Sequence, residues 1–236
     1  MRAQEIRKEA LSKLEGNWIP MIGMCLLTAI AIAALNWLSI LLVPLLIPGL
    51  CVFSLNLVRG AKPEITDLVS TYKNYLNALV AYVLFAVIIA GWTFLIVVPC
   101  VFFIHLLFAE IFLEIFISPV LTAYALLMTV CSLLLVIPAV IFYYMLSQIF
   151  YLLADNPQIG AVEVLKKSAE MMKGYKWKLF CLHLSFIGWY LLGIVTLGIA
   201  FIWVGPYIKT ANTIFYENLK SLTDKNTIEV DPLEVK

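Results

Sequence analysis

Two histidines and two nearby glutamates are the residues of this sequence best suited to proton transfer or cation binding. Glu110 and Glu114 are four residues apart, so a helix would place both carboxylates on one face. His105 precedes them, but its five-residue separation from Glu110 fits a helix face poorly. His183 lies near the start of a later apolar run. We expect an acidic outer loop around the glutamates and a neutral His183 bonded to a neighbouring helix; a cation site or proton relay is the sharper alternative.

Asparagine side chains in the apolar runs are the other polar candidates. Amides in membrane helices usually form hydrogen bonds between helices, whereas an ionisable residue inside a membrane is a functional candidate by default. The candidate intramembrane polar residues are therefore His183, Asn36, Asn56, Asn212, Glu110 and Glu114.

Motifs of known catalytic or metal chemistry are missing from the sequence. The five cysteines are odd in number and form no CxxC pair, so neither a metal site nor a disulfide framework is indicated. There is no HExxH motif, no Gly-rich phosphate loop and no GxSxG motif. We therefore predict no catalytic residue, no metal site and no cofactor, and we predict that the protein is not an enzyme. An intramembrane enzyme with His183, Glu110 or Glu114 as acid–base groups is the less favoured alternative.

The composition indicates a chain whose solvent is mostly lipid. Of 236 residues, 63% are hydrophobic and 13% are charged, whereas soluble domains have about 45–50% apolar and about 25% charged residues. This difference excludes an ordinary soluble enzyme and a nucleic-acid-binding module. Four stretches contain no charged residue, namely 16–58, 74–109, 115–154 and 179–208. A membrane-spanning helix needs about 20 apolar residues, so the predicted fold class is an all-α, polytopic helical membrane protein.

The placement of charge predicts the orientation of the chain. All 16 Lys and Arg residues lie within 1–15, 59–73, 155–178 and 209–236, and cytoplasmic loops collect such residues. We therefore predict a multi-pass protein with both termini in the cytoplasm. About six membrane segments satisfy this arrangement: 19–43, 44–58, 78–104, 115–153, 178–204 and 206–219. A division of 78–153 into four shorter spans at Pro99, Pro119 and Pro138 is the alternative.

Three segments, 2–15, 64–77 and 157–173, have apolar residues at helical spacing and lead into apolar runs. We expect amphipathic helices at the inner leaflet, where basic side chains contact membrane lipids. The alternative is a docking surface for a cytoplasmic protein partner. The interfacial basic residues are Arg7, Lys8, Lys166, Lys167 and Lys173.

A weak internal repeat relates the two ends of the chain. An offset of 158 residues aligns Gly16 with Gly174 and Pro48 with Pro206. The predicted organisation is a single membrane domain over 1–222, with repeat units 2–58 and 160–219, followed by a polar tail over 223–236. Transporters contain such repeats, so the pattern keeps a transport function open.

The second half of the chain resembles a known family. Residues 151–157 (Tyr-Leu-Leu-Ala-Asp-Asn-Pro) and 168–174 (Ser-Ala-Glu-Met-Met-Lys-Gly) carry the likeness, which is strong from 131 to 217. These strings resemble bacterial integral membrane proteins grouped as domain of unknown function 975. That family usually has Pro-Gly where this chain has Pro138-Ala139. The resemblance implies a bacterial membrane protein. Its distant likeness to the membrane domain fused to some glycerophosphodiester phosphodiesterases implies a membrane anchor or accessory module, and no catalytic residues transfer from that likeness.

Together these features predict a non-enzymatic accessory or scaffold protein of the bacterial cytoplasmic membrane. Its expected partners are membrane lipids and a protein bound at the cytoplasmic amphipathic helices, with no nucleic acid. The alternative function is a transporter, or a peptide-export or self-protection factor. That alternative rests on the repeat and on the polar residues of the apolar runs.

Overall fold

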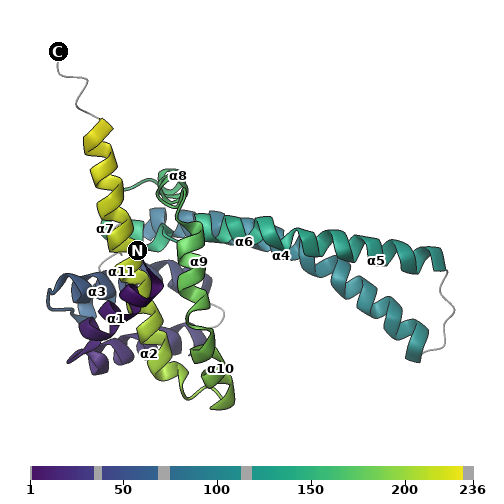
Figure 1. Ribbon diagram of the computed structural model, residues 1–236, viewed down its shortest axis with the longest axis horizontal. Coiled ribbons are helices and arrows are strands. Elements are labelled where there is room, and N and C mark those ends of the chain that lie inside the picture. Colours follow the sequence, from purple (N-terminus) through teal and green to yellow (C-terminus); the bar gives the residue numbers. More distant parts are fainter. Residues whose placement is uncertain (1, 35–38, 69–74, 113–118, 231–236) are drawn as a thin grey trace. The chain divides into compact units, whose positions relative to one another are not determined.

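A computed structural model describes residues 2–34, 39–68, 75–112 and 119–230 of the chain (Figure 1). These residues form helices and no strand, which confirms the predicted all-α class. The helices are α1 (Ala3–Leu14), α2 (Trp18–Ala34), α3 (Ser39–Arg59), α4 (Tyr75–Phe112), α5 (Pro119–Leu134), α6 (Val136–Met145), α7 (Ile149–Asp155), α8 (Ala161–Met171), α9 (Lys176–Leu184), α10 (Ile187–Val195) and α11 (Phe201–Val230).

In the described part of the chain, four helical segments are long and apolar enough to cross a membrane: Leu41–Arg59, Tyr75–Ala109, Pro119–Asp155 and Lys176–Val195. The pair α1 and α2, bent by 100°, makes a fifth if it counts as one broken span. The expected six segments are therefore matched in four or five cases. The expected segment 206–219 lies in α11, which does not pass this test among the described residues.

The prolines do not divide 78–153 into four spans. Helix α4 continues through Pro99 without a break. Pro138 is the third residue of α6, close to the helix start, where a missing N–H costs no helical hydrogen bond. The chain therefore runs through this region as two long apolar segments, as in the six-segment prediction.

The amphipathic segments differ in how well they match the helices. Helices α1 and α8 correspond to the expected helices 2–15 and 157–173. Of the expected helix 64–77, the described part is only a short 3₁₀ turn at 65–68 and the start of α4. The expected polar tail begins inside α11, which continues as a helix to Val230.

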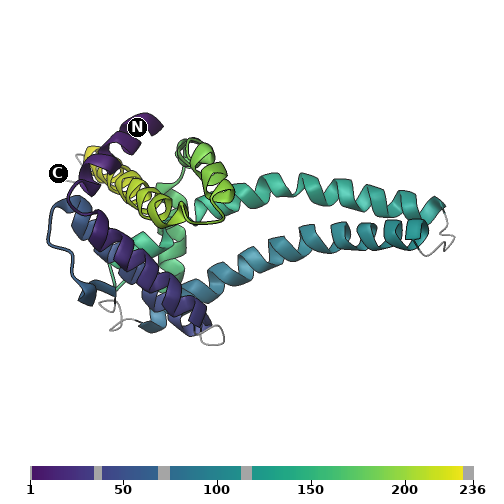
Figure 2. The ribbon, with the colours of Figure 1, turned by 90° about the horizontal axis from the view of Figure 1, so that it is seen from below.

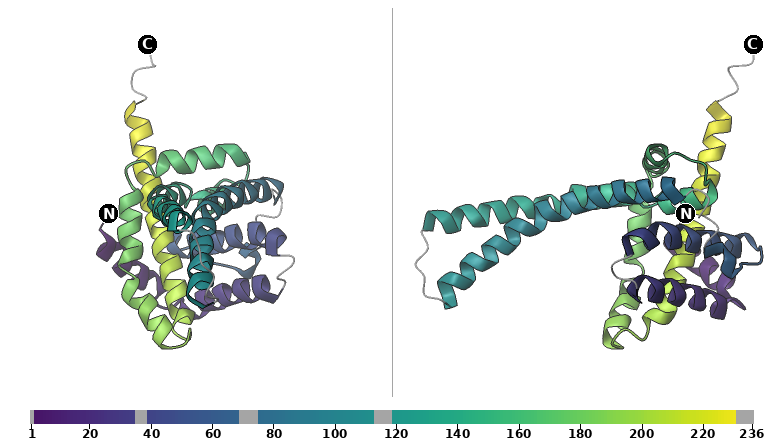
Figure 3. Two further views of the ribbon diagram at one scale, coloured as in Figure 1. Left: turned by 90° about the vertical axis from the view of Figure 1, so that its right-hand side faces the viewer. Right: turned by 180° about the vertical axis from the view of Figure 1, so that it is seen from behind.

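Contacts divide the chain into two compact units. The first comprises residues 1–82 and 145–236, and α11 is its central helix, packed against α1, α2, α3, α8 and α10. Figure 3 shows α11 running beside α9 and α10 and extending beyond its neighbours at its C-terminal end. The largest fully buried side chains of this unit include Phe53, Phe186, Phe215 and Tyr216.

The second unit, residues 83–144, is an antiparallel helical hairpin (Figure 2). Its two arms meet where Thr129 donates a 3.3 Å hydrogen bond to the Pro99 carbonyl and where Trp92 and Phe142 pack with ring centroids 5.5 Å apart. None of the most apolar window of Tyr75–Ala109 is buried inside the protein. Such exposure of apolar side chains is expected where lipid is the solvent.

Helix starts recur at the offset predicted for the internal repeat. Helices α1 and α8 begin at Ala3 and Ala161, and α2 and α9 begin at the same separation. Gly16 and Gly174, which precede α2 and α9, have φ angles of 80° and 83°, a conformation that glycine adopts without steric cost. The packing differs, because α1 lies on α11 while α8 lies mainly on α7. A duplication of the units 2–58 and 160–219 stays a hypothesis supported by these local matches.

Candidate functional site

An ionic network joins the ends of α3 and α7 to the middle of α11. The Arg59 guanidinium lies 2.8 Å from the Asp155 carboxylate and 2.6 Å from that of Glu217. Lys220 forms a second ion pair with Asp155. The Tyr216 hydroxyl donates a 3.1 Å hydrogen bond to the same carboxylate. Two positive and two negative charges therefore compensate one another across three helices.

The position of this network marks one boundary of the apolar layer. Two candidate membrane spans, Leu41–Arg59 and Pro119–Asp155, end in residues of the network. Charged side chains concentrate where a membrane helix meets water, because their desolvation in the hydrocarbon is costly. The ends of α3 and α7 therefore meet at one end of these two apolar segments.

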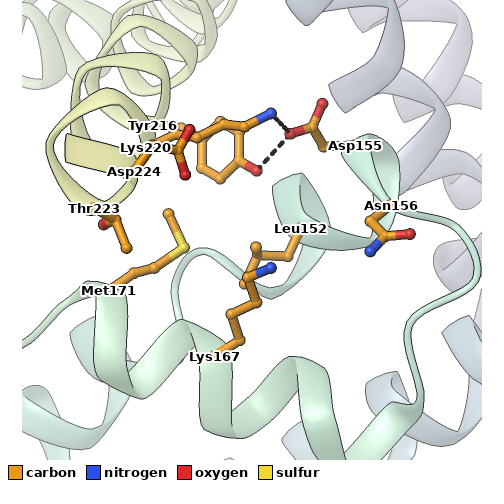
Figure 4. Close-up of a pocket in the computed structure, with 9 residues that line it drawn as sticks. All are labelled: Leu152, Asp155, Asn156, Lys167, Met171, Tyr216, Lys220, Thr223 and Asp224. Atoms are coloured by element: carbon orange, nitrogen blue, oxygen red, sulfur yellow. Dashed lines mark hydrogen bonds and ion pairs between the residues drawn. The ribbon is translucent and has the colours of Figure 1, made fainter. Parts of the chain in front are cut away.

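A polar pocket of about 270 Å³ opens beside the network, between α7, α8 and α11. Figure 4 shows the side chains that line it. Lys167 extends its ammonium from α8 into the pocket, and Asp224 and Thr223 lie on the α11 wall. Leu152 and Met171 supply apolar lining. The pocket thus combines charged, hydroxyl and apolar groups at the membrane boundary.

Tyr216 separates the pocket from the helix core. Its phenol donates a hydrogen bond to the Asp155 carboxylate. Its ring also stacks on that of Tyr151, with centroids 5.3 Å apart. Tyr151 in turn contacts Lys209 and Thr213, so the stack connects the network to these polar groups.

Lys209 is the residue that sequence reasoning missed. It is half-buried on α11, where its ammonium donates to Cys51 at 2.9 Å and lies 4.4 Å from the centre of the Tyr151 ring. Cys51 precedes Arg59 by eight residues, which is about 12 Å along a helix. Within the described residues no carboxylate forms an ion pair with Lys209.

Lys209 belongs to the C-terminal basic segment 209–236, yet it directly follows the uncharged stretch 179–208. That adjacency is the sequence signal that could have identified it. Nearby hydroxyls add to the polar character of this part of the core. Thr213 donates to Ser54 at 2.9 Å, and both residues are fully buried. A lysine at this depth is a functional candidate on the same grounds as an intramembrane histidine.

Two of the predicted polar residues come together. An imidazole nitrogen of His183 lies 3.0 Å from the amide oxygen of Asn212, joining α9 to α11. Asn56 instead donates to Asp67 at 3.0 Å, which ties α3 to the following turn. The His183–Asn212 contact is the kind of cross-helix bond expected of amides in membrane helices. Any further role of these three residues stays a prediction.

The His105–Glu110–Glu114 group is only partly visible. His105 bonds the Val101 carbonyl of its own helix at 2.8 Å. Glu110 lies near the end of α4, but its side chain falls outside the described residues, as do Glu114 and Asn36. Among the described residues no group of histidine, cysteine and acidic side chains is arranged to hold a metal ion.

The basic residues of the amphipathic helices divide into two kinds. Lys8, Lys166, Lys167 and Lys173 are exposed, as expected for contact with head groups or a partner. Arg7 differs from that expectation, because it points into the protein. It donates to the Ser185 carbonyl at the end of α9 and to the Tyr207 hydroxyl, and its guanidinium covers the Phe186 ring. A cation at a helix C-terminus is favoured by the helix dipole.

Comparisons with known proteins place the chain in a family without assigning it a chemistry. No curated protein and no solved structure matches the chain. A family model matches residues 1–223, nearly the whole chain, and confirms the resemblance found in the second half. The chain therefore belongs to the family described as "Protein of unknown function (DUF975)".

Proposed function

We propose that this chain is a non-enzymatic accessory or scaffold protein of the bacterial cytoplasmic membrane, with several passes and both termini in the cytoplasm. The orientation is supported by the network at the ends of α3 and α7, since these ends precede the basic segments 59–73 and 155–178. Because such segments favour the cytoplasmic side, the network and its pocket face the cytoplasm.

The observation that carries the proposal is how the polar side chains of the first unit are used. His183 bonds Asn212, Thr213 bonds Ser54, and Asp155 holds cations from two other helices. These groups fix helices to one another. The exposed polar groups instead lie at the boundary, on α8 and around the pocket. A helical unit that is held together in this way and presents polar side chains at the membrane surface is suited to binding a partner.

Site-specific photocrosslinking in native membranes tests this role. A photoreactive residue at Val162, exposed on α8, is compared with one at Phe94, exposed in the apolar hairpin. We expect Val162 to yield a discrete protein adduct and Phe94 to yield none. The adduct's partner should copurify with the unmodified protein and lose abundance or assembly when this chain is deleted. A Val162 probe without a discrete adduct, or a partner unaffected by the deletion, contradicts the proposal.

Transport, including peptide export or self-protection, is the second candidate, and Lys209 is the observation that favours it. This half-buried cation contacts Cys51, about 12 Å along α3 from Arg59, and the Tyr151 ring, and it forms no ion pair within the described residues. Proteoliposomes can be loaded with inorganic phosphate or with a labelled amphipathic peptide. Flux that requires the protein and is lost in Lys209→Met, but kept in the exposed control Lys166→Met, would favour transport over the scaffold role.

A further inference from the structure

The pocket beside the ionic network carries two opposite charges that do not pair. Lys167 reaches it from α8, and Asp224 lies across it on α11 (Figure 4). Both residues are exposed, and neither forms an ion pair within the described part of the chain. The cation four residues before Asp224, Lys220, is already paired with Asp155. The pocket therefore presents one available positive charge and one available negative charge on different walls.

This arrangement selects for a ligand with both charges. The four charges of the network compensate one another, so they add little net field to the pocket. A purely anionic ligand would be attracted to Lys167 but repelled by Asp224. A purely cationic ligand would be attracted to Asp224 but repelled by Lys167. A zwitterion of suitable length contacts both residues with favourable charge. Charge complementarity of this kind sets specificity more than it sets affinity.

Volume and position narrow the ligand further. At about 270 Å³ the pocket lies just below the range of drug-sized ligand sites, roughly 300–1,000 Å³, so it suits a group of a few heavy atoms. Asp155, where a candidate span ends, lines the same pocket, so the pocket opens where lipid head groups lie. Asn156 adds an amide and Thr223 a hydroxyl to the wall, while Met171 adds apolar surface.

We propose that this pocket binds a phosphoethanolamine group, with its phosphate against Lys167 and its primary ammonium against Asp224. A phosphate accepts charge-assisted hydrogen bonds from lysine, and a primary ammonium donates them to a carboxylate. The group can belong to a phospholipid of the surrounding leaflet or to a soluble phosphate ester. The inference adds a ligand to the proposed accessory role, and it does not depend on which protein partner α8 contacts.

Native mass spectrometry of the full-length protein in detergent tests the lipid form. Phosphatidylethanolamine is titrated against phosphatidylglycerol, which lacks the ammonium, and against phosphatidylcholine, whose quaternary ammonium donates no hydrogen bond. We expect phosphatidylethanolamine to bind about fivefold or more tightly than either, the effect of one partly exposed charged hydrogen bond. Equal binding of the three lipids, or tightest binding of phosphatidylglycerol, overturns the proposal.

Variants identify the two walls separately. Lys167→Met should weaken phosphatidylethanolamine binding about fivefold, while Lys62→Met, an exposed lysine of the loop after α3 that does not line the pocket, should leave it unchanged. Asp224→Asn should remove the preference over phosphatidylglycerol. If both lysine variants act alike, or if Asp224→Asn keeps the preference, the assignment of these residues is wrong.

Competition with soluble phosphoethanolamine distinguishes the two sources of the group. Displacement of the lipid at millimolar concentration shows that the head group alone is recognised, and failure to displace it shows that the lipid chains are required. Photocrosslinking at Val162 in the Asp224→Asn protein separates this inference from the proposed function. An unchanged protein adduct beside lost lipid preference means that partner binding and head-group binding are independent.

Discussion

Removing the charge of Asp155 is the sharpest test of the ionic network. Asp155→Asn keeps the shape of the side chain but leaves Arg59 with Glu217 as its acidic partner and removes the carboxylate that pairs with Lys220. The Asp155 side chain is 13% exposed, whereas those of its two cationic partners are 38% and 39% exposed. Its carboxylate is therefore shielded from water while its partners are half solvated.

The expected loss lies between two limits. Breaking a buried pair costs about 3–5 kcal/mol, and an exposed pair contributes about 0–1 kcal/mol. The mixed exposure of this network places Asp155→Asn near 2 kcal/mol. In a protein of this size about 1 kcal/mol corresponds to roughly 2–4 °C in Tm, so we expect Tm to fall by about 4–8 °C in detergent.

Thermal unfolding of the purified protein, followed by aggregation and by helical circular dichroism, measures the effect. Tyr216→Phe removes one hydrogen bond to the charged Asp155 carboxylate and should cost about 1.5 kcal/mol. Glu9→Gln, an exposed residue of α1 outside the network, should leave Tm unchanged. An Asp155→Asn protein whose Tm lies within one degree of that of the unmodified protein, or is no lower than that of Glu9→Gln, contradicts the expected role of the network.

Three further substitutions follow from the contacts of the first unit. Lys209→Met should keep or raise Tm, because it replaces a half-buried cation whose neighbours are neutral; a fall of several degrees would mean that an acidic group holds this lysine. Arg7→Met should cost about 1–2 kcal/mol through two lost hydrogen bonds and a lost ring contact, and Lys8→Met should cost nothing measurable by the same assay. His183→Leu should lower Tm by the equivalent of about 1 kcal/mol, because it leaves the Asn212 amide oxygen without the imidazole; a matched loss in His183→Gln would show that packing, rather than the hydrogen bond, is what matters.

Features that depend on local pattern could be predicted from the sequence. The all-α class follows from long uncharged stretches, and α1 and α8 follow from apolar residues at helical spacing. The cross-helix role of Asn212 follows from the general behaviour of buried amides. Each of these depends on neighbours within one helix or on the solvent, and a single sequence contains that information.

Features that depend on pairing between distant helices could not be predicted in the same way. The Arg59–Asp155 pair joins positions 96 residues apart, and its Glu217 contact spans 158 residues. Arg7 is one of several basic residues on α1, and only the packing of α1 on α11 selects it for the end of α9. Its spacing alone is equally typical of a lipid-facing side chain. Knowledge of the helix packing is what separates the two uses.

Helix α11 contains the sixth membrane segment of the proposed topology, although it is not apolar enough to be recognised as a span by its composition. Lys176 and Glu217 lie in two segments that are both predicted to be cytoplasmic. The chain between them is therefore predicted to cross the membrane and to return to the side where Glu217 joins the ionic network. In the proposed topology, α9 and α10 supply the outward path and α11 supplies the return. Helix α11 carries strongly polar residues such as Lys209 and Asn212, and its Thr210 and Thr213 are fully buried. Surrounded by α1, α2, α3 and α10, α11 is solvated by protein in place of lipid, and its polar side chains find partners there. With α2 as an outward segment and α3 as its return, α11 completes the six crossings of the proposed topology.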